Sequence, residues 1–371
     1  MGQVSSLKVL AVCWVLSSWA VLAQGSDIEE VFVSGKVLQN DQVNALKIPT
    51  LIINVPQSLS IVTGEEINKK GMREIGDIAR YTPGVNTSLG EGHRDAIVFR
   101  GVRSTADFFQ DGARDDVQYY RSLYNVDQVE ILRGPNALLF GRGGTGGAIN
   151  RVSKKAVIGT DFNILDVGFD SFGAYDLATD LNWNLTDTVA LRLNAHSDTL
   201  KNHRDFYEGK RLGVNPSLKM QLTSDTTLNL SYEYIDHERF IDRGIPTANG
   251  GPVEALKDIV FGDKDGNVHR VEASVFRASL NHVFSDSAKG RLSITSNTFE
   301  KMYQNTYANN YYPNTNTVQM DGYNDPTERS NLIIAGNLVN EFVIGNTSHT
   351  LLSGFESIET ENSNQIGRAH V

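Results

Sequence analysis

Cysteine is almost absent from this sequence: among its 371 residues there is one, Cys13, and it lies in an apolar N-terminal stretch. In residues 1–23 an early Lys8 precedes the apolar run Val9–Ala20 and the exit Val21-Leu22-Ala23, a pattern typical of a cleaved secretory signal peptide. We expect cleavage after Ala23. The mature chain would then hold no thiol, which excludes disulfides, thiolate metal sites and a cysteine nucleophile.

Long apolar runs and excess positive charge are also missing. After residue 23 no run approaches the roughly 20 apolar residues of a membrane-spanning helix, so an exported chain of this kind is secreted, periplasmic or an outer-membrane barrel. The net charge of −10 argues against nucleic acid as a partner. The eight histidines do not form a metal-ligand constellation, and no nucleophile–base pair stands out. The sequence therefore predicts a protein that is not an enzyme and that binds no metal itself.

The glycines of Gly141-Arg-Gly-Gly-Thr-Gly146 spell the G-x-G-x-x-G of dinucleotide-binding loops. That pattern has this meaning only where a strand leads directly into it and a helix follows it within a βαβ unit. Eight residues separate the strand-like "VEIL" from Gly141, and Gly147 stands where a phosphate-binding loop needs lysine. The glycines are therefore interpreted as allowing tight turns and positive φ where the chain folds against a barrel wall.

Residues 28–156 mix short strands, short helices and many glycines, which is typical of a compact α+β domain. Thr63, with Glu66 three residues later, predicts a helix start through a capping box. Two short helices are expected before Pro83-Gly84, which stops them. The strand-like segments "AIVFRGV" and "VEILRG" follow. The helices share a narrow apolar stripe of Ile67, Met72, Ile75, Ile78 and Ala79.

From about Phe162 the pattern changes to alternation. In "VALRLNAH" (189–196) apolar residues fall on one face of a strand and mainly polar residues on the other, and further segments repeat this. Short turns at 184–188, 224–226, 285–287 and 345–348 alternate with long polar links at about 198–209, 237–266 and 301–326. This alternation predicts an outer-membrane barrel, with a soluble β-sandwich as the alternative. Aromatic residues near the turns fit an interfacial girdle: Trp183, Phe284, Phe342 and Phe355.

Five segments, in this order and spacing, resemble the plug domain of TonB-dependent outer-membrane receptors: "NVPQSLSIVTGEEI", "ARYTPGV", "IVFRGV", "FFQDGARDD" and "VEILRGPNALLFGRGGTGGAINRVSKK". The resemblance begins near Glu29, is most specific over residues 49–155, and is similar to the catecholate-type siderophore receptors. It implies an α+β plug domain at 49–156, followed by an antiparallel transmembrane β-barrel of the plugged, 22-stranded type. The implied protein lies in the outer membrane of a Gram-negative bacterium, in contact with outer-membrane lipid, and imports ferric siderophore.

Residues 24–48 are expected to carry the contact with the energy-supplying partner. "EEVFVSG" resembles a TonB box, formed by Glu29, Glu30, Val31, Phe32, Val33, Ser34 and Gly35. Its apolar centre favours an extended strand, which can add to the edge of a partner's sheet through backbone hydrogen bonds. The resemblance implies that this partner is the TonB–ExbB–ExbD energy-transducing complex. An ordinary first strand of the plug is the alternative interpretation.

Arg100 in "FRGV" and Arg133 in "LRGP" match plug arginines that face barrel glutamates in the family. An enclosed guanidinium needs a carboxylate partner, and breaking such pairs would make a latch for plug movement. A static pairing is the alternative. Glu341, on the polar side of its strand, is the candidate glutamate partner.

Three loops are expected to reach cargo by resemblance: 88–94, 103–107 and 113–122. A ferric catecholate complex is anionic and aromatic, so arginines and aromatic rings suit it. The protein itself would bind no cofactor, because iron arrives as ferric siderophore. Cobalamin, haem or a glycan are alternative cargoes, and a passive porin-like channel is the alternative function. The candidate ligand-binding residues are His93, Arg94, Arg114, Gln118, Tyr119, Tyr120 and Arg121.

Residues 157–365 supply about nine strands, an odd number, whereas single-chain bacterial barrels use even numbers. Nine strands would leave two edges in lipid with unpaired backbone groups. We therefore expect a C-terminally truncated receptor. The tail "IGRAHV" (366–371) breaks the strand pattern and matches one reading frame of a common sequencing adapter. It is interpreted as non-native, with a native loop as the alternative.

Overall fold

The computed structural model of the protein describes residues 42–43, 50–51, 57–134, 146–364 and 367–370. The predicted signal peptide, the TonB-box segment 29–35 and residues 141–145 lie outside this part of the chain. Within it, β1 (Gln42–Val43) pairs with β2 (Thr50–Leu51) in a short antiparallel ladder. Two larger bodies of strands follow, which we name the plug region (residues 58–153) and the wall sheet (residues 162–364).

The plug region contains two small sheets. The larger has the order β3-β9-β10-β7-β8, and its neighbours are antiparallel except for β10 and β7, which run parallel. Its strands are β3 (Ser58–Thr63), β9 (Val126–Arg133), β10 (Gly147–Ser153), β7 (Phe108–Gln110) and β8 (Ala113–Arg114). The smaller sheet joins β4 (Val85–Thr87), β5 (Ile97–Phe99) and β6 (Val102–Ser104).

The two predicted helices are present. α3 (Gly64–Lys69) begins at the predicted cap, because the Thr63 hydroxyl accepts a hydrogen bond from the Glu66 amide at 3.2 Å. In α4 (Ile75–Arg80) the Asp77 carboxylate accepts the backbone amides of Arg73 and Glu74, at 3.0 and 3.2 Å. This second cap, which the sequence analysis did not predict, fixes the position of the residues just before α4.

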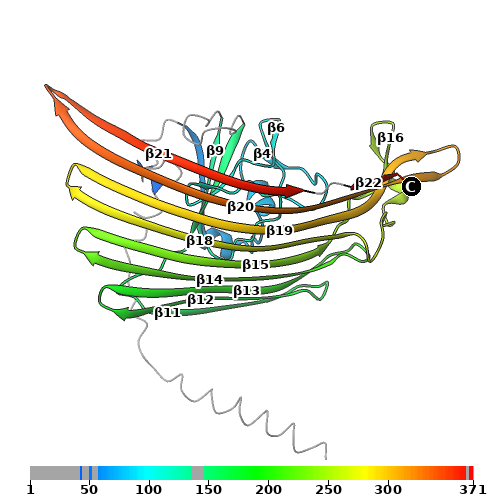
Figure 1. Cartoon of the computed structure of the whole chain (residues 1–371). Helices are drawn as coiled ribbons and strands as arrows, with labels where there is room; N and C mark the ends of the chain where they lie inside the picture. The colour runs from blue at the N-terminus through cyan, green and yellow to red at the C-terminus, as the bar shows by residue number, and fades with distance from the viewer. Residues whose placement is uncertain (1–41, 44–49, 52–56, 135–145, 365–366, 371) are drawn as a thin grey trace, which may run out of the picture. The chain divides into compact units, whose positions relative to one another are not determined.

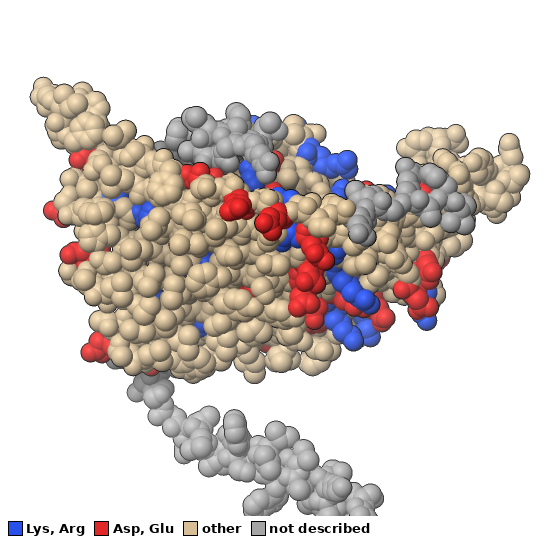
Figure 2. All heavy atoms as spheres, in the orientation of Figure 1, with Lys and Arg blue, Asp and Glu red and all other residues tan. Residues whose placement is uncertain are grey.

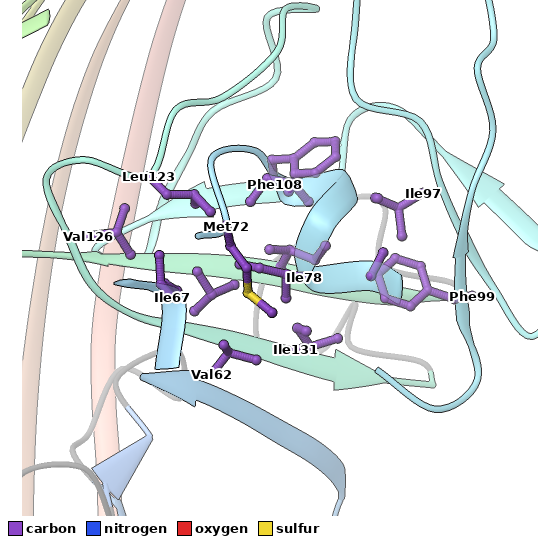
Figure 3. Close-up of a cluster of buried hydrophobic side chains, with 14 residues drawn as sticks. Val62, Ile67, Met72, Ile78, Ile97, Phe99, Phe108, Leu123, Val126 and Ile131 are labelled. Atoms are coloured by element: carbon purple, nitrogen blue, oxygen red, sulfur yellow. The ribbon is translucent and has the colours of Figure 1, made fainter. Parts of the chain in front are cut away.

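The core of the plug region lies between these helices and the strands (Figure 3). The predicted apolar stripe is confirmed, since all five of its side chains are buried there. Side chains from β3, β5, β7, β9 and β10, with Leu123 just before β9, complete the cluster: Val62, Ile97, Phe99, Phe108, Leu123, Val126, Val129, Ile131 and Ile149. Burying this much apolar surface is the main stabilising contribution to the plug region.

The wall sheet is antiparallel, and its strands lie side by side in chain order (Figure 1). This agrees with the prediction of an α+β region followed by antiparallel strands, about nine in number. The strands are β11 (Phe162–Phe169), β12 (Tyr175–Thr186), β13 (Val189–Lys201), β14 (Glu208–Thr223), β15 (Thr226–Phe240), β18 (Val268–Ser285), β19 (Ala288–Tyr312), β20 (Thr317–Ile344) and β21 (Thr347–Asn364).

The four predicted short turns are confirmed, because β12–β13, β14–β15, β18–β19 and β20–β21 are all tight hairpins. The link from β15 to β18 is long, and it contains β16 (Thr247–Ala248), β17 (Gly251–Pro252) and the short 3₁₀ helix η2 (Glu254–Leu256). The predicted long link at 301–326 is wrong. β19 and β20 remain paired through it up to a turn at 313–316, since backbone pairing does not require apolar side chains.

Beyond β21, β22 (Gly367–His370) pairs with residues 321–324 of β20. The tail was expected to break the strand pattern, but residues 367–370 have an extended, paired backbone. This pairing does not bear on whether the six residues are native, so their origin stays a prediction.

The glycine-rich stretch joins two antiparallel strands, since β9 pairs with β10 and Gly147 lies opposite Arg133. In the described residues a strand therefore follows the loop, where a dinucleotide fold would have a helix. Gly147 is required by close packing: a Cβ there would lie 2.5 Å from the Leu132 carbonyl oxygen and 2.6 Å from the Phe99 ring. This contact is inside the plug region and not against the wall sheet.

Candidate functional site

The polar face of the wall sheet is the buried one. Along β13 every second residue is buried, and these residues are Ala190, Arg192, Asn194, His196 and Asp198. The ring of Tyr124, from the plug region, stacks on His196 with 4.2 Å between ring centroids. The polar face of the wall therefore packs against the plug region, the reverse of the arrangement in a soluble sheet.

The opposite face of the wall is apolar and exposed. The face turned to the viewer in Figure 2 shows a broad uncharged area, bordered on the right by a column of acidic and basic side chains. A contiguous exposed apolar surface of this kind marks contact with a membrane or a partner, and polar-in, apolar-out strands are typical of outer-membrane barrels. Exposed apolar residues of this sheet include Tyr232, Phe276, Leu280, Leu292, Ile294, Leu332 and Leu338.

The expected aromatic girdle is partly visible on the described strands. Phe284, Phe342 and Phe355 are exposed near the tight hairpins, whereas Trp183 is only half-exposed. Aromatic side chains at such positions suit the boundary between lipid and water.

Four carboxylates lie directly opposite one another across neighbouring strands. The register pairs Asp236 of β15 with Glu272 of β18, then Glu300 of β19, then Glu328 of β20. We call this set the acidic row; all four of its residues are exposed or half-exposed. Like charges at directly opposed positions destabilise a sheet, so the row is not explained by strand pairing.

Glu233 is a buried wall carboxylate that holds the plug region. Arg277 of β18 donates to its Oε2 at 3.0 Å, and Asn125 of the plug region donates to its Oε1 at 2.9 Å. Gln110 of β7 accepts from Arg277 at 2.7 Å and donates to Glu233 at 3.4 Å. The wall thus offers Glu233 several partners at once, which offsets the cost of burying its charge, while Asn125 Oδ1 and Arg277 Nε have no hydrogen-bond partner among the described residues.

Glu74 is the corresponding plug carboxylate, and two wall arginines donate to its Oε1. Arg211 of β14 does so at 2.8 Å and Arg239 of β15 at 2.7 Å. Burial opposes ionisation of Glu74, but attraction to Arg239 and Arg211 outweighs it and holds the pKa of the carboxyl below its usual value. The neighbouring Arg73 pairs with Asp176 of β12, so the residues before α4 contact three wall strands.

The three loops expected to reach cargo meet at Gln118. Its side-chain oxygen accepts from Arg94 of loop 88–94, and its amide nitrogen donates to Thr105 of loop 103–107 at 3.5 Å. Arg94 also pairs with Glu91 at 2.9 Å, and Arg114 donates to the Ala106 carbonyl at 3.1 Å. The structure brings these predicted residues together, and their contact with a ligand stays a prediction.

Three of the expected ligand residues are buried instead, which corrects their assignment to loop surfaces. Arg121 has no exposed side-chain surface: it donates to Asp115 at 2.9 Å and to Asp95 at 3.3 Å, and its guanidinium lies over the Phe108 ring. Tyr119 donates to Asp115 at 3.0 Å, and burial raises the pKa of its hydroxyl.

The third is His93, whose ring stacks on Tyr303 of β19 at 3.8 Å; burial holds its pKa well below the usual value. Arg121 and Tyr119 support the loops from inside, because their buried polar groups find hydrogen-bond partners there, whereas the His93 ring is held by stacking and neither of its nitrogens has a hydrogen-bond partner among the described residues. Tyr120, by contrast, is half-buried, and Arg239 lies over its ring at 4.1 Å.

Arg100 and Arg133 lie together and contact serines, where the resemblance implied barrel glutamates. Arg133 donates to Ser58 at 3.0 Å and to Ser60, and Arg100 donates to Ser58 at 3.4 Å. Burial and the charge of Arg100 lower the pKa of Arg133. Within the described residues neither arginine pairs with a glutamate, and Glu341 is exposed beside a hairpin. The expected latch through these two residues stays a prediction.

Sequence reasoning missed Glu74, Arg211, Arg239, Glu233 and Arg277. The sequence did hold a signal for the four wall residues: they occupy the polar positions of alternating strands, and a barrel turns those positions inward. No signal in the sequence pairs Glu74 with them, because Glu74 and Arg239 are 165 positions apart.

Two features are absent from the described residues. No helix there is both long and apolar enough to cross a membrane. No three His, Cys, Asp or Glu side chains in this part of the chain are grouped so that they could hold a metal ion.

Residues 52–148 match the TonB-dependent Receptor Plug Domain family. This chain carries a TonB-dependent receptor plug domain. The matched residues include both helices and most of the larger plug sheet, so the contacts described above join a receptor plug to the strands that follow it. The resemblance inferred from the sequence is thereby confirmed, and so are the expected plug and the antiparallel strands after it.

The relatives of this chain include proteins named as probable TonB-dependent receptors. The chain is 31% identical over 213 residues to the probable TonB-dependent receptor BfrD of Bordetella pertussis, covering 56% of this chain and 28% of that protein. It is 28% identical over 262 residues to the probable TonB-dependent siderophore receptor PiuA of Acinetobacter baumannii, covering 67% of this chain and 35% of that protein. The expected outer-membrane localisation agrees with these relatives and with the apolar outer face of the wall sheet.

Solved structures show the same fold. The ferric-catecholate import receptor Fiu of Escherichia coli K12, in its open form, superposes with a TM-score of 0.79 at 21% identity, covering 88% of this chain and 52% of that one. The chain thus spans about a third of the curated relatives' length and about half of this solved receptor.

Proposed function

We propose that the protein is an outer-membrane receptor for the energy-coupled import of a ferric siderophore. The observation that carries this proposal is the plug region packed against the polar face of a wall whose other face is apolar. A passive channel needs a water-filled lumen and no such domain, whereas a gated importer needs a part that can move aside. The relatives' names support a receptor and not an enzyme.

The proposed cargo is anionic and aromatic, a ferric complex of catecholate type that the protein binds without a cofactor of its own. The likeness to a ferric-catecholate import receptor supports this choice. Arg94, Arg114 and Gln118 are the proposed contacts, because the three loops meet there and these side chains are not fully buried. Charge-assisted hydrogen bonds from arginine would favour such an anion over a neutral cargo.

The proposed energy source is the TonB–ExbB–ExbD complex, reached through the segment Glu29–Gly35. A strand of this kind binds by adding to a sheet edge, so its grip depends on backbone donors. Proline at Val31 removes one donor, whereas alanine at Val31 removes the same side chain and keeps the donor. The pair of variants therefore separates backbone pairing from side-chain contact.

The experiment is uptake of ⁵⁵Fe-labelled ferric catecholate by cells that produce the protein from its complete gene. Uptake should stop when the proton gradient is collapsed and in the Val31→Pro variant, and should continue in Val31→Ala. Uptake that survives both the collapse and the proline would refute energy coupling. Equal uptake of cobalamin or haem would refute the proposed cargo.

A further inference from the structure

The contact between Glu74 and the wall combines a plug carboxylate, two wall arginines and a residue of a predicted cargo loop. Arg211 is also paired with Asp198 of β13, through its Nε at 2.9 Å. Among the described residues, Glu74 is the one carboxylate within ion-pair distance of Arg239. Displacing Glu74 would leave Arg211 paired and Arg239 buried without a carboxylate, which is strongly unfavourable.

A second plug group shares Arg239. The guanidinium lies 4.1 Å from the ring centroid of Tyr120, which belongs to loop 113–122. The same loop is joined to Glu74 through its backbone, since Ser122 forms an isolated antiparallel bridge with Glu74. The loop therefore contacts both members of the Glu74–Arg239 pair, and a rearrangement of the loop alters the surroundings of each.

Glu74 is also tied to the plug core. Ile75 follows it directly and is fully buried, and Asp77 accepts the Glu74 amide. Glu74 therefore does not lie on a flexible surface segment that could swing away from the two arginines. Because its backbone is fixed in this way, a displacement of Glu74 away from the wall moves the start of α4, which packs in the core of the plug region.

We propose that Glu74 is the positioning residue that retains the plug against the wall through Arg239, and that Tyr120 links this retention to the binding of cargo at loop 113–122. The role of Tyr120 rests on the proposed import function. The latch predicted at Arg100 and Arg133 placed arginines on the plug. The Glu74 pair has the opposite polarity, with the carboxylate on the plug and the arginines on the wall.

Hydrogen–deuterium exchange of the α4 amides, without cargo, tests retention in outer-membrane vesicles containing the protein from its complete gene. Glu74→Gln is expected to accelerate exchange by about tenfold or more, because it removes the ionic contact that holds α4. Glu66→Gln is the matched control: it removes a carboxylate paired with Lys70 on the surface of α3, and exchange should stay within about twofold of wild type. Equal exchange in the two variants would overturn the retention role.

A double variant keeps the test valid if the Glu74→Gln protein fails to insert into the outer membrane. Glu74→Gln combined with Arg239→Met leaves no unpaired buried charge, so it should fold, and its α4 exchange should remain faster than wild type. Exchange at the wild-type rate in this double variant would likewise overturn the proposal. Glu74→Asp, which keeps the charge, should restore at least part of the protection.

Tyr120 is tested by a pair of substitutions with two readouts. Tyr120→Phe keeps the ring over Arg239, whereas Tyr120→Leu removes it, so energised uptake divided by equilibrium cargo binding should differ by about threefold between these two variants. An equal ratio in Tyr120→Leu and Tyr120→Phe would remove the link to the loop. Failure of wild-type uptake would refute the import function and leave the exchange comparison standing.

Discussion

The plug region and the wall sheet use alternating strands with different results. In β9 of the plug region both faces are buried: Val129 and Ile131 join the apolar core beside the helices, and Gln128 and Glu130 on the other face are buried too. In β19 of the wall, Leu292 and Ile294 are exposed, while Asn297 on the other face is buried. Alternation thus identifies two faces but does not say which is inside. The surroundings decide, because a strand in lipid stabilises its apolar face by exposing it.

The largest effect is expected from Arg121→Ala in the plug region. The substitution would leave Asp95 and Asp115 buried without one of their cations, at a cost of about 3–5 kcal/mol in the free energy of unfolding. Chemical denaturation of the detergent-solubilised protein measures this. Arg103→Ala, at an exposed position of the same region, serves as control and should change stability little. A loss below about 1 kcal/mol for Arg121→Ala would show that the buried network is not required.

The same substitution made in both regions sharpens the comparison. Ile131→Ala, in the plug core, should cost about 2–5 kcal/mol because it leaves a cavity. Ile294→Ala, on the outer face of the wall, should cost less than about 1 kcal/mol in a bilayer, because lipid chains refill the space. Unfolding in lipid vesicles gives both values. Equal costs would mean that the outer face of the wall is packed against protein.

A pH dependence is expected from Asp95. Burial raises its pKa to about 6, against attraction from Arg121, so the folded state holds this proton more tightly than the unfolded state does. The contribution of Asp95 to stability is therefore greatest below pH 4 and declines as pH rises to about 6, by roughly 2–3 kcal/mol. The pKa values of Glu74 and Asp115 are lowered in the folded state, so their contributions to folding stability are lost only when the pH falls below the usual carboxyl range. Asp95→Asn should abolish the decline between pH 4 and 6; an unchanged decline would contradict this assignment.

The smallest effect is expected in the acidic row of the wall. Glu300→Lys places a positive charge between Glu272 and Glu328, and each new opposed pair should stabilise the sheet by about 0.2–1 kcal/mol. Glu300→Gln removes repulsion without adding attraction and should give a smaller gain. Both gains should shrink at high salt, because exposed charges are screened. A loss of stability in both variants would mean that the row binds a cation or a cationic partner.

The sequence by itself determined the local elements. The cap at Thr63, the apolar stripe and the tight hairpins depend on residues within a few positions of one another, and all were predicted. It also determined the order of the two regions, since the change from mixed pattern to alternation is visible along the chain. It misplaced the end of the β19–β20 hairpin, because polar strands pair by the same backbone hydrogen bonds as apolar ones.

Only the tertiary structure decided which polar residues meet. From the sequence, Arg121 was predicted to bind the ligand. In the structure it is buried, and its contacts with Phe108, Asp95 and Asp115 stabilise the loop from inside. Glu74 and Arg239 belong to different regions, and their contact follows from how the plug region lies against β14 and β15. Local patterns fix secondary structure because their interactions are short in sequence, whereas ion pairs at an interface depend on the folded positions of both partners.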